Sequence, residues 1–142
     1  MLAALVALAL LAAPVTPIEG TPEAASAAFL DAFKKMDEPR FDSFFAPEAS
    51  MFFPDGPFPK GRVEGREAVL SAFHSFFKLV KARGRSTLNI TPLEQRVQRY
   101  GDVAVVTFRL DQDGAVGRRS IVLRKVAKEW RIVHFHASTI EQ

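Results

Sequence analysis

Apolar residues recur every three or four positions in two stretches of the first half of the chain. This spacing predicts amphipathic helices over residues 22–36 and 66–82. Thr21 is an N-cap candidate for the first of them, with Pro22 at its first helical position. A short helix is predicted between the two, over residues 40–45. The apolar stripes of the long helices consist of Phe29, Phe33 and Met36, and of Val69, Phe73, Phe76 and Val80.

Beyond residue 88 the pattern changes to the alternation of apolar and polar residues that is typical of β-strands. The connections between these strands are short, so the strands are sequential antiparallel neighbours. An isolated strand is predicted earlier, at residues 49–53. Helices followed by an antiparallel meander indicate an α+β fold. The strands predicted in this second half are 88–100 (running past Pro92), 103–110, 118–126 and 130–139.

The composition describes one globular domain. The 142 residues are 48% hydrophobic, which is enough for a core and too much for a disordered chain. Phenylalanine occurs 13 times, against one Trp and one Tyr, so the core is bulky and does not close fully around its centre. Lys and Arg number 19 and Asp and Glu 16, without a dense basic stripe, so we predict no nucleic-acid partner. The chain has no cysteine, which excludes disulfides and thiolate chemistry.

An apolar run at residues 2–13 matches the hydrophobic region of a secretory signal peptide. It is too short to span the ~30 Å hydrocarbon core of a bilayer, and Ala12 and Ala13 suit cleavage. We therefore divide the chain into a signal peptide with linker, residues 1–20, and one domain, residues 21–142. This predicts a secreted or periplasmic protein with no membrane attachment after processing. No Lys or Arg precedes the run, so a retained hydrophobic helix packed on a partner, or a misassigned start, stays open.

The order of elements predicts a pocket between two layers. A proline-rich loop follows the strand at 49–53 and continues to about Gly65, and long loops of this kind often rim a site. Helices on one face of a strongly curved sheet would close its concave side. We therefore expect an α+β fold with a cone-like, strongly curved antiparallel sheet and three N-terminal helices closing a pocket. The other face would be half apolar, which favours a homodimer formed sheet to sheet.

His134 and His136 are the first candidates for chemistry. They are two residues apart on a predicted strand, which puts them on one face about 7 Å apart, together with Trp130, Ile132 and Ser138. Three interpretations stay open. The imidazoles line the pocket as general acid, general base or hydrogen-bond donor; they bind a metal together; or they only satisfy neighbouring hydrogen bonds.

A metal site would need a third or fourth ligand. The candidates are His74, Asp55 and Glu94, and none of them stands at a diagnostic spacing. We therefore predict neither a metal nor a cofactor.

Arg109 is the third candidate ligand-binding residue. In its strand, Thr107 and Arg109 alternate with the apolar Val106 and Phe108, so one face carries a hydroxyl and a guanidinium. Facing a pocket, this guanidinium could hold a carboxylate or an enolate through two hydrogen bonds. The alternative is an exposed arginine on the outer face.

Three other polar residues receive no assigned role. His74 lies among phenylalanines on the predicted helix 66–82, and Tyr100 precedes a turn. Asp42 lies where the short helix meets the core, and we align it with no catalytic position.

Three motifs point to a known superfamily: F-F-A-P-E-A-S-M-F-F-P at 44–54, G-R-E-A-V at 65–69, and K-E-W-R-I-V-H-F-H-A-S at 128–138. Over about residues 22–140 the chain resembles the nuclear-transport-factor-2-like (NTF2-like) superfamily. The last motif is the most specific, because it is similar to the closing strand of SnoaL-like domains and of the calcium/calmodulin-dependent kinase association domain.

The resemblance implies a cone fold, a pocket and a tendency to dimerise. The association domain has a pocket-facing Arg in a strand that resembles V-T-F-R-L, which implies the same position for Arg109. Ketosteroid isomerase, another member, relies on a Tyr/Asp oxyanion hole and a separate Asp base. With one Tyr, at a turn, this sequence does not reproduce that set, and the Tyr, His and Asp pattern of scytalone dehydratase is not evident either. Whether the chain is an enzyme stays open.

The sequence leaves three functions open. We favour an exported homodimer that binds a small, partly apolar ligand, anionic if Arg109 holds it, with His134 and His136 as further contacts. The second is a cofactor-independent isomerase, dehydratase or cyclase that uses a pocket His as general acid or base. The third is a structural dimerisation domain. The second needs a His that lies within hydrogen-bond reach of an acidic partner and is open to a cavity.

Overall fold

A computed structural model describes residues 20–140 of the chain. The predicted signal peptide therefore lies outside the described residues, and export stays a prediction. Within this range, no helix is both long and apolar enough to cross a membrane. The elements are α1 (Pro22–Lys35), α2 (Glu38–Asp42), β1 (Phe45–Phe52), β2 (Val63–Glu64), α3 (Arg66–Ala82), β3 (Ile90–Tyr100), β4 (Val103–Gln112), β5 (Ala115–Val126) and β6 (Glu129–Thr139).

The helices begin where the sequence places their capping residues. The Thr21 hydroxyl accepts a hydrogen bond from the Ala24 amide at 3.1 Å, which caps α1 as predicted. Helix α1 ends at Met36, whose φ of +49° lies in the left-handed region. The α3 prediction is confirmed at both ends. Helix α2 begins two residues earlier than predicted, because Asp37 caps it.

The six strands form one open sheet in the order β2-β1-β6-β5-β4-β3. Strands β3 to β6 are the predicted antiparallel meander. The predicted sheet was wholly antiparallel, and this is wrong at one pair, because β1 lies parallel to β6. Strand β3 includes Pro92. An edge strand pairs with a neighbour on one side only, so not every residue has to donate a backbone hydrogen bond.

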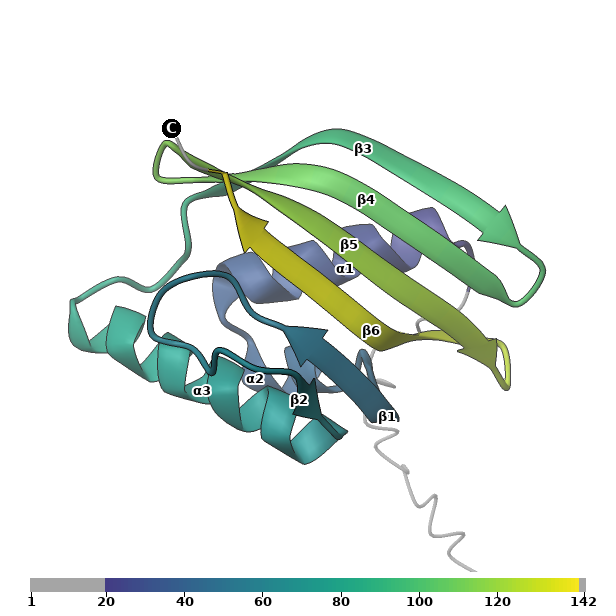
Figure 1. The fold of residues 1–142 in the computed structure, drawn as a ribbon, viewed down its shortest axis with the longest axis horizontal. Coiled ribbons are helices and arrows are strands. Elements are labelled where there is room, and N and C mark those ends of the chain that lie inside the picture. The colour runs from purple at the N-terminus through teal and green to yellow at the C-terminus, as the bar shows by residue number, and fades with distance from the viewer. Residues whose placement is uncertain (1–19, 141–142) are drawn as a thin grey trace, which may run out of the picture.

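The helices cover one face of the sheet, which we call the inner face. In Figure 1, α1 runs behind the meander, α3 lies beside β1 and β2, and α2 packs against α1. The opposite, outer face is not covered by any described element. The predicted α+β fold with three helices against one curved sheet is thus confirmed, and the sheet is open.

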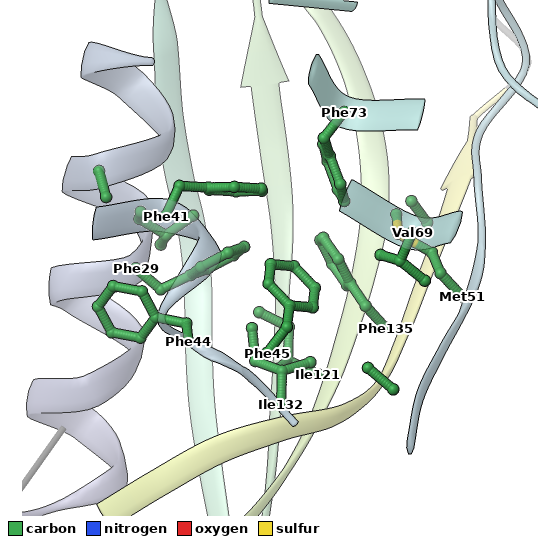
Figure 2. Packing of buried hydrophobic residues seen from close by; sticks show 14 of the residues in the cluster. Phe29, Phe41, Phe44, Phe45, Met51, Val69, Phe73, Ile121, Ile132 and Phe135 are labelled. Carbon is green, nitrogen blue, oxygen red and sulfur yellow. The ribbon is translucent and has the colours of Figure 1, made fainter. Parts of the chain in front are cut away.

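Phenylalanine rings fill the space between the two layers. Phe41 of α2 is fully buried, and its ring centroid lies 4.8 Å from that of Phe73 and 5.2 Å from that of Phe45. Figure 2 shows these rings together with Phe29 of α1 and Phe135 of β6. Such aromatic pairs add about 0.5–1.5 kcal/mol each beyond the burial of their area. The rings therefore join all three helices to the sheet.

A β-bulge in β6 decides which side chains face this core. The register with β5 shifts between the pairs Leu123–Ile132 and Val122–His134, so Val133 is an extra residue. Ile132 lies inward before the bulge and Phe135 lies inward after it. The prediction that residues 130, 132, 134, 136 and 138 share one face is therefore wrong. His134, His136 and Ser138 lie on the outer face, because one extra residue inverts the alternation.

Removing the central ring tests this account of the core. We expect Phe41→Ala to lower the free energy of unfolding by about 3–5 kcal/mol, because the ring leaves a cavity among its aromatic neighbours. Urea unfolding followed by circular dichroism measures the loss. The control is Leu79→Ala, since Leu79 is 45% exposed on α3, and it should change stability by less than about 0.5 kcal/mol. Equal effects of both variants would contradict a core centred on Phe41.

Candidate binding cavity

A cavity of about 350 Å³ lies between the inner face and the helices. It sits at the end of the sheet where the β4–β5 turn and the C-terminal end of β6 come together (Figure 1). The loop after β1 forms another wall, as predicted for this proline-rich segment. Exposed Asp55, Ala115 and Thr139 belong to the lining, so the cavity reaches the surface. Its aromatic walls are Phe33, Phe53, Phe58, Phe73, Phe76 and Phe135.

Arg119 is the cationic side chain of the described lining. It lies on the inner face of β5, opposite Phe108 of β4 and Ala137 of β6. Its Nη1 donates hydrogen bonds to the Arg118 carbonyl at 2.9 Å and the Ser138 carbonyl at 3.3 Å. Among residues 20–140, no carboxylate lies within 4.0 Å of its guanidinium. Burial without a counter-charge lowers the pKa of Arg119 to about 10.

Gly117 makes room for this guanidinium. A Cβ atom at residue 117 would lie 2.5 Å from Nη1 of Arg119 and 2.6 Å from the Ser138 carbonyl oxygen. Neither distance is tolerable, and the carbonyl belongs to the backbone of the neighbouring strand. Any larger residue at 117 would therefore displace the Arg119 side chain.

Two carboxylates also line the cavity, and both lie near its opening. Asp113 forms two hydrogen bonds to Arg85, at 2.9 and 3.0 Å, which hold the pKa of Asp113 below its usual range. Asp55 is exposed in the loop after β1. The charged groups of the described lining are thus one half-buried cation inside and two acids near the opening.

Arg109 lies on the outer face and does not line the cavity. Its Nε and Nη2 each donate to Glu94 at 2.9 Å. Glu94 sits at an irregularity of β3 with a φ of +54°, which brings its carboxylate over Arg109. The bidentate geometry expected of Arg109 is present, but a protein side chain occupies it. Its role in ligand binding stays a prediction without a cavity beside it.

His134 and His136 lie on the same outer face, at its β1 side. Nδ1 of His134 lies 2.8 Å from the Ser50 hydroxyl, and both imidazoles pack against the ring of Phe52. Partial burial, and then electrostatic repulsion from the neighbouring His136 and Arg62, lower the pKa of His134. Neither histidine lines the cavity.

His74 and Asp42 form a pair that the sequence did not connect. Nε2 of His74 lies 2.7 Å from Oδ1 of Asp42, which joins α3 to α2. His74 faces a shallow hollow on α3, away from the phenylalanine-lined cavity. Tyr100 is 64% exposed at its turn. Within residues 20–140, no three His, Asp or Glu side chains gather as a metal site would require.

Sequence reasoning missed Arg119 and Gly117. The signal is present in β5, where Gly117, Arg119, Ile121 and Leu123 share one face and Arg118, Ser120 and Val122 share the other. A single Arg within an inward-facing apolar row is unusual, because burying an unpaired charge is costly.

This open, helix-covered sheet is shared with solved structures of NTF2-like proteins, which are similar to this chain in fold. A candidate dehydratase of the NTF2-like family from Streptomyces avermitilis has a TM-score of 0.71 and 18% identity, covering 84% of this chain and 94% of that one. An NTF2-like protein of unknown function from Pseudomonas putida has a TM-score of 0.69 and 15% identity, with 87% and 92% covered. At these identities the likeness shows the fold alone.

A candidate calcium/calmodulin-dependent protein kinase type II association domain from Thiobacillus denitrificans is 26% identical, with a TM-score of 0.66, covering 89% of this chain and 100% of that one. No curated protein matches the sequence. Residues 23–141 match the SnoaL-like domain family, and the chain belongs to it.

The environment of His134 makes a pH-dependent prediction. We expect an NMR titration to give His134 a pKa below the ordinary value of about 6.5, because partial burial and the neighbouring His136 and Arg62 oppose its protonation. The unfolded chain then binds this proton more readily than the folded one, so His134 lowers stability as the pH falls through about 6.5. Arg62→Gln should raise the His134 pKa. A value at or above 6.5 in the unmutated protein would contradict this description.

Proposed function

We propose that this SnoaL-like domain binds a small, largely apolar molecule in the cavity beside Arg119. The observation that carries the proposal is a phenylalanine-lined space of about 350 Å³ that the core leaves unfilled. Ligand sites are typically concave and mostly apolar, with a few convergent polar groups. The cavity has this make-up, with the half-buried Arg119 as its cationic group.

Binding is favoured over catalysis by what the lining contains. No histidine of residues 20–140 lines this cavity, so an isomerase, dehydratase or cyclase of the kind expected lacks its histidine base there. The similar structures include the candidate dehydratase and a candidate ketosteroid isomerase from Parabacteroides distasonis, the latter 19% identical with a TM-score of 0.67. Identities this low do not transfer an activity, and catalysis stays an untested alternative.

The second part of the proposal is a homodimer formed through the outer face. Val105 and Val122 pair across strands β4 and β5 on this face, and Phe52 lies on it at the edge near β2. These apolar side chains are only half-buried in a single chain. A second copy would cover them, whichever function the cavity has, so the alternative of a purely structural dimerisation domain shares this interface.

A charge at the centre of the outer face tests the dimer. We expect sedimentation equilibrium to give the protein twice the mass of one chain, and Val122→Lys to give the mass of a single chain, because a lysine there would be desolvated without a partner. Leu79→Lys, on α3, should remain dimeric. A monomeric unmutated protein would contradict the proposed interface.

A bulky residue at the mouth of the cavity tests ligand binding. Ala115 is exposed and lines the cavity, so Ala115→Trp should block access without disturbing the core. We expect the neutral fluorescent probe N-phenylnaphthylamine to bind the unmutated protein and to bind Ala115→Trp at least tenfold more weakly. The matched control is Ala68→Trp, at an exposed position of α3 outside the lining. Equal binding by all three proteins would mean that the probe binds elsewhere.

A further inference from the structure

The hydrogen bonds of Arg119 leave one edge of its guanidinium free. Both of its contacts to carbonyl oxygens come from Nη1. Nε and Nη2 have no acceptor among residues 20–140, yet no fully buried side-chain nitrogen or oxygen there lacks a partner. These two nitrogens are therefore accessible, from a side chain that lines the cavity. Their N–H groups lie on one edge of the guanidinium and are spaced to match the two oxygens of a carboxylate.

The backbone holds this edge in place. The Arg118 and Ser138 carbonyls fix Nη1 from two neighbouring strands, and Gly117 leaves the space in which Nη1 lies. A flexible arginine loses side-chain freedom when it binds an anion, and an arginine already oriented loses less. On the outer face, Nε and Nη2 of Arg109 bind the two carboxylate oxygens of Glu94 in this same geometry.

We propose that the cavity selects a monocarboxylate with an aromatic or alkyl tail, bound through Nε and Nη2 of Arg119. The tail lies among the rings of Phe53, Phe73, Phe76 and Phe135. The inference rests on the proposed function, because it names the class of molecule that the cavity takes. Gly117 is a positioning residue in this account.

The charge of the lining favours one negative charge over none or two. A neutral ligand leaves the half-buried guanidinium without a counter-charge. Burial of this charge is unfavourable, and it lowers the pKa of Arg119. A phosphate dianion brings a second charge that nothing in the described lining neutralises, and it must pass the acids Asp55 and Asp113. Of Asp113 and Asp55, only Asp113 is paired with a cation, Arg85. A single carboxylate neutralises Arg119, so the bound pair carries no net charge.

A pair of ligands that differ only at the head group tests the inference. Cinnamate is an aromatic monocarboxylate, and cinnamamide is its neutral counterpart of nearly the same shape. We expect isothermal titration calorimetry to show cinnamate binding at least tenfold more tightly than cinnamamide. Arg119→Gln should abolish this preference while leaving cinnamamide binding within about twofold. Arg119→Lys should keep only part of it, because an ammonium group lacks the two-pronged edge.

The controls separate the head-group interaction from general charge and from folding. Arg118→Gln removes the neighbouring arginine, which is exposed on the outer face, and should leave the preference unchanged. Gly117→Ala keeps Arg119 but displaces its Nη1, so it should reduce the preference at least tenfold. Thermal unfolding followed by circular dichroism identifies any variant that fails to fold, and the conservative Arg119→Lys variant then decides the test.

The outcomes distinguish this inference from the function on which it rests. Equal affinities for cinnamate and cinnamamide, both lost in Ala115→Trp, would overturn the carboxylate inference and leave cavity binding standing. A cinnamate preference that survives Arg119→Gln would place the anion elsewhere and also overturn it. Absence of binding by both ligands and by N-phenylnaphthylamine would count against the proposed function itself.

Discussion

The extra residue at Val133 in β6 is the constraint on which the rest of this structure depends. Without it, a strand that buries Trp130 and Ile132 would direct Phe135 and Ala137 to the outer face. With it, both ends of β6 contribute apolar side chains to the inner face. Trp130 at one end is fully buried and donates its indole N–H to the Gly20 carbonyl at 3.0 Å. Phe135 and Ala137 at the other end line the cavity.

The same inversion separates two chemistries on the two faces. The inner face at this end of the sheet carries Phe rings and one half-buried cation, Arg119, beside the space that Gly117 leaves open. The outer face carries His134, His136 and the paired Arg109. An unpaired arginine is costly in the interior and is tolerated where a ligand can supply the missing charge. This physical difference is why we place the site on the inner face.

Much of the fold could be predicted because its signals are local. The predicted bounds of helix α3 match the structure at both ends. Its apolar stripe lies within the segment, and Gly65 and Gly84 lie just outside its two ends. The meander matched because its turns are short. The parallel pairing of β1 with β6 could not be predicted, because the two strands are 76 residues apart between Phe52 and Glu129 and no turn fixes their register.

The presence of a pocket could be predicted from the sequence, but the residues that line it could not. A pocket rimmed by the proline-rich loop was expected, but the residues assigned to it were Arg109, His134 and His136, none of which lines the cavity. For the histidines the cause is the bulge at Val133, which a period of two does not reveal. For Arg109, the alternation in its strand predicts two faces of the sheet but does not indicate which face the helices cover. Arg119 was overlooked because it follows Arg118 directly at the start of the predicted strand 118–126, and the sequence alone does not tell which of the two faces the helices.

Isotope-edited NMR of the protein titrated with cinnamate tests the central claim most directly, because it reports both faces of the sheet at once. The account predicts that the side-chain Nε–H signal of Arg119 and the amide signal of Gly117 shift with ligand concentration. The imidazole signals of His134 and His136 should stay unchanged. Shifts confined to these histidines and Arg109, with Arg119 unaffected, would contradict a binding site on the inner face.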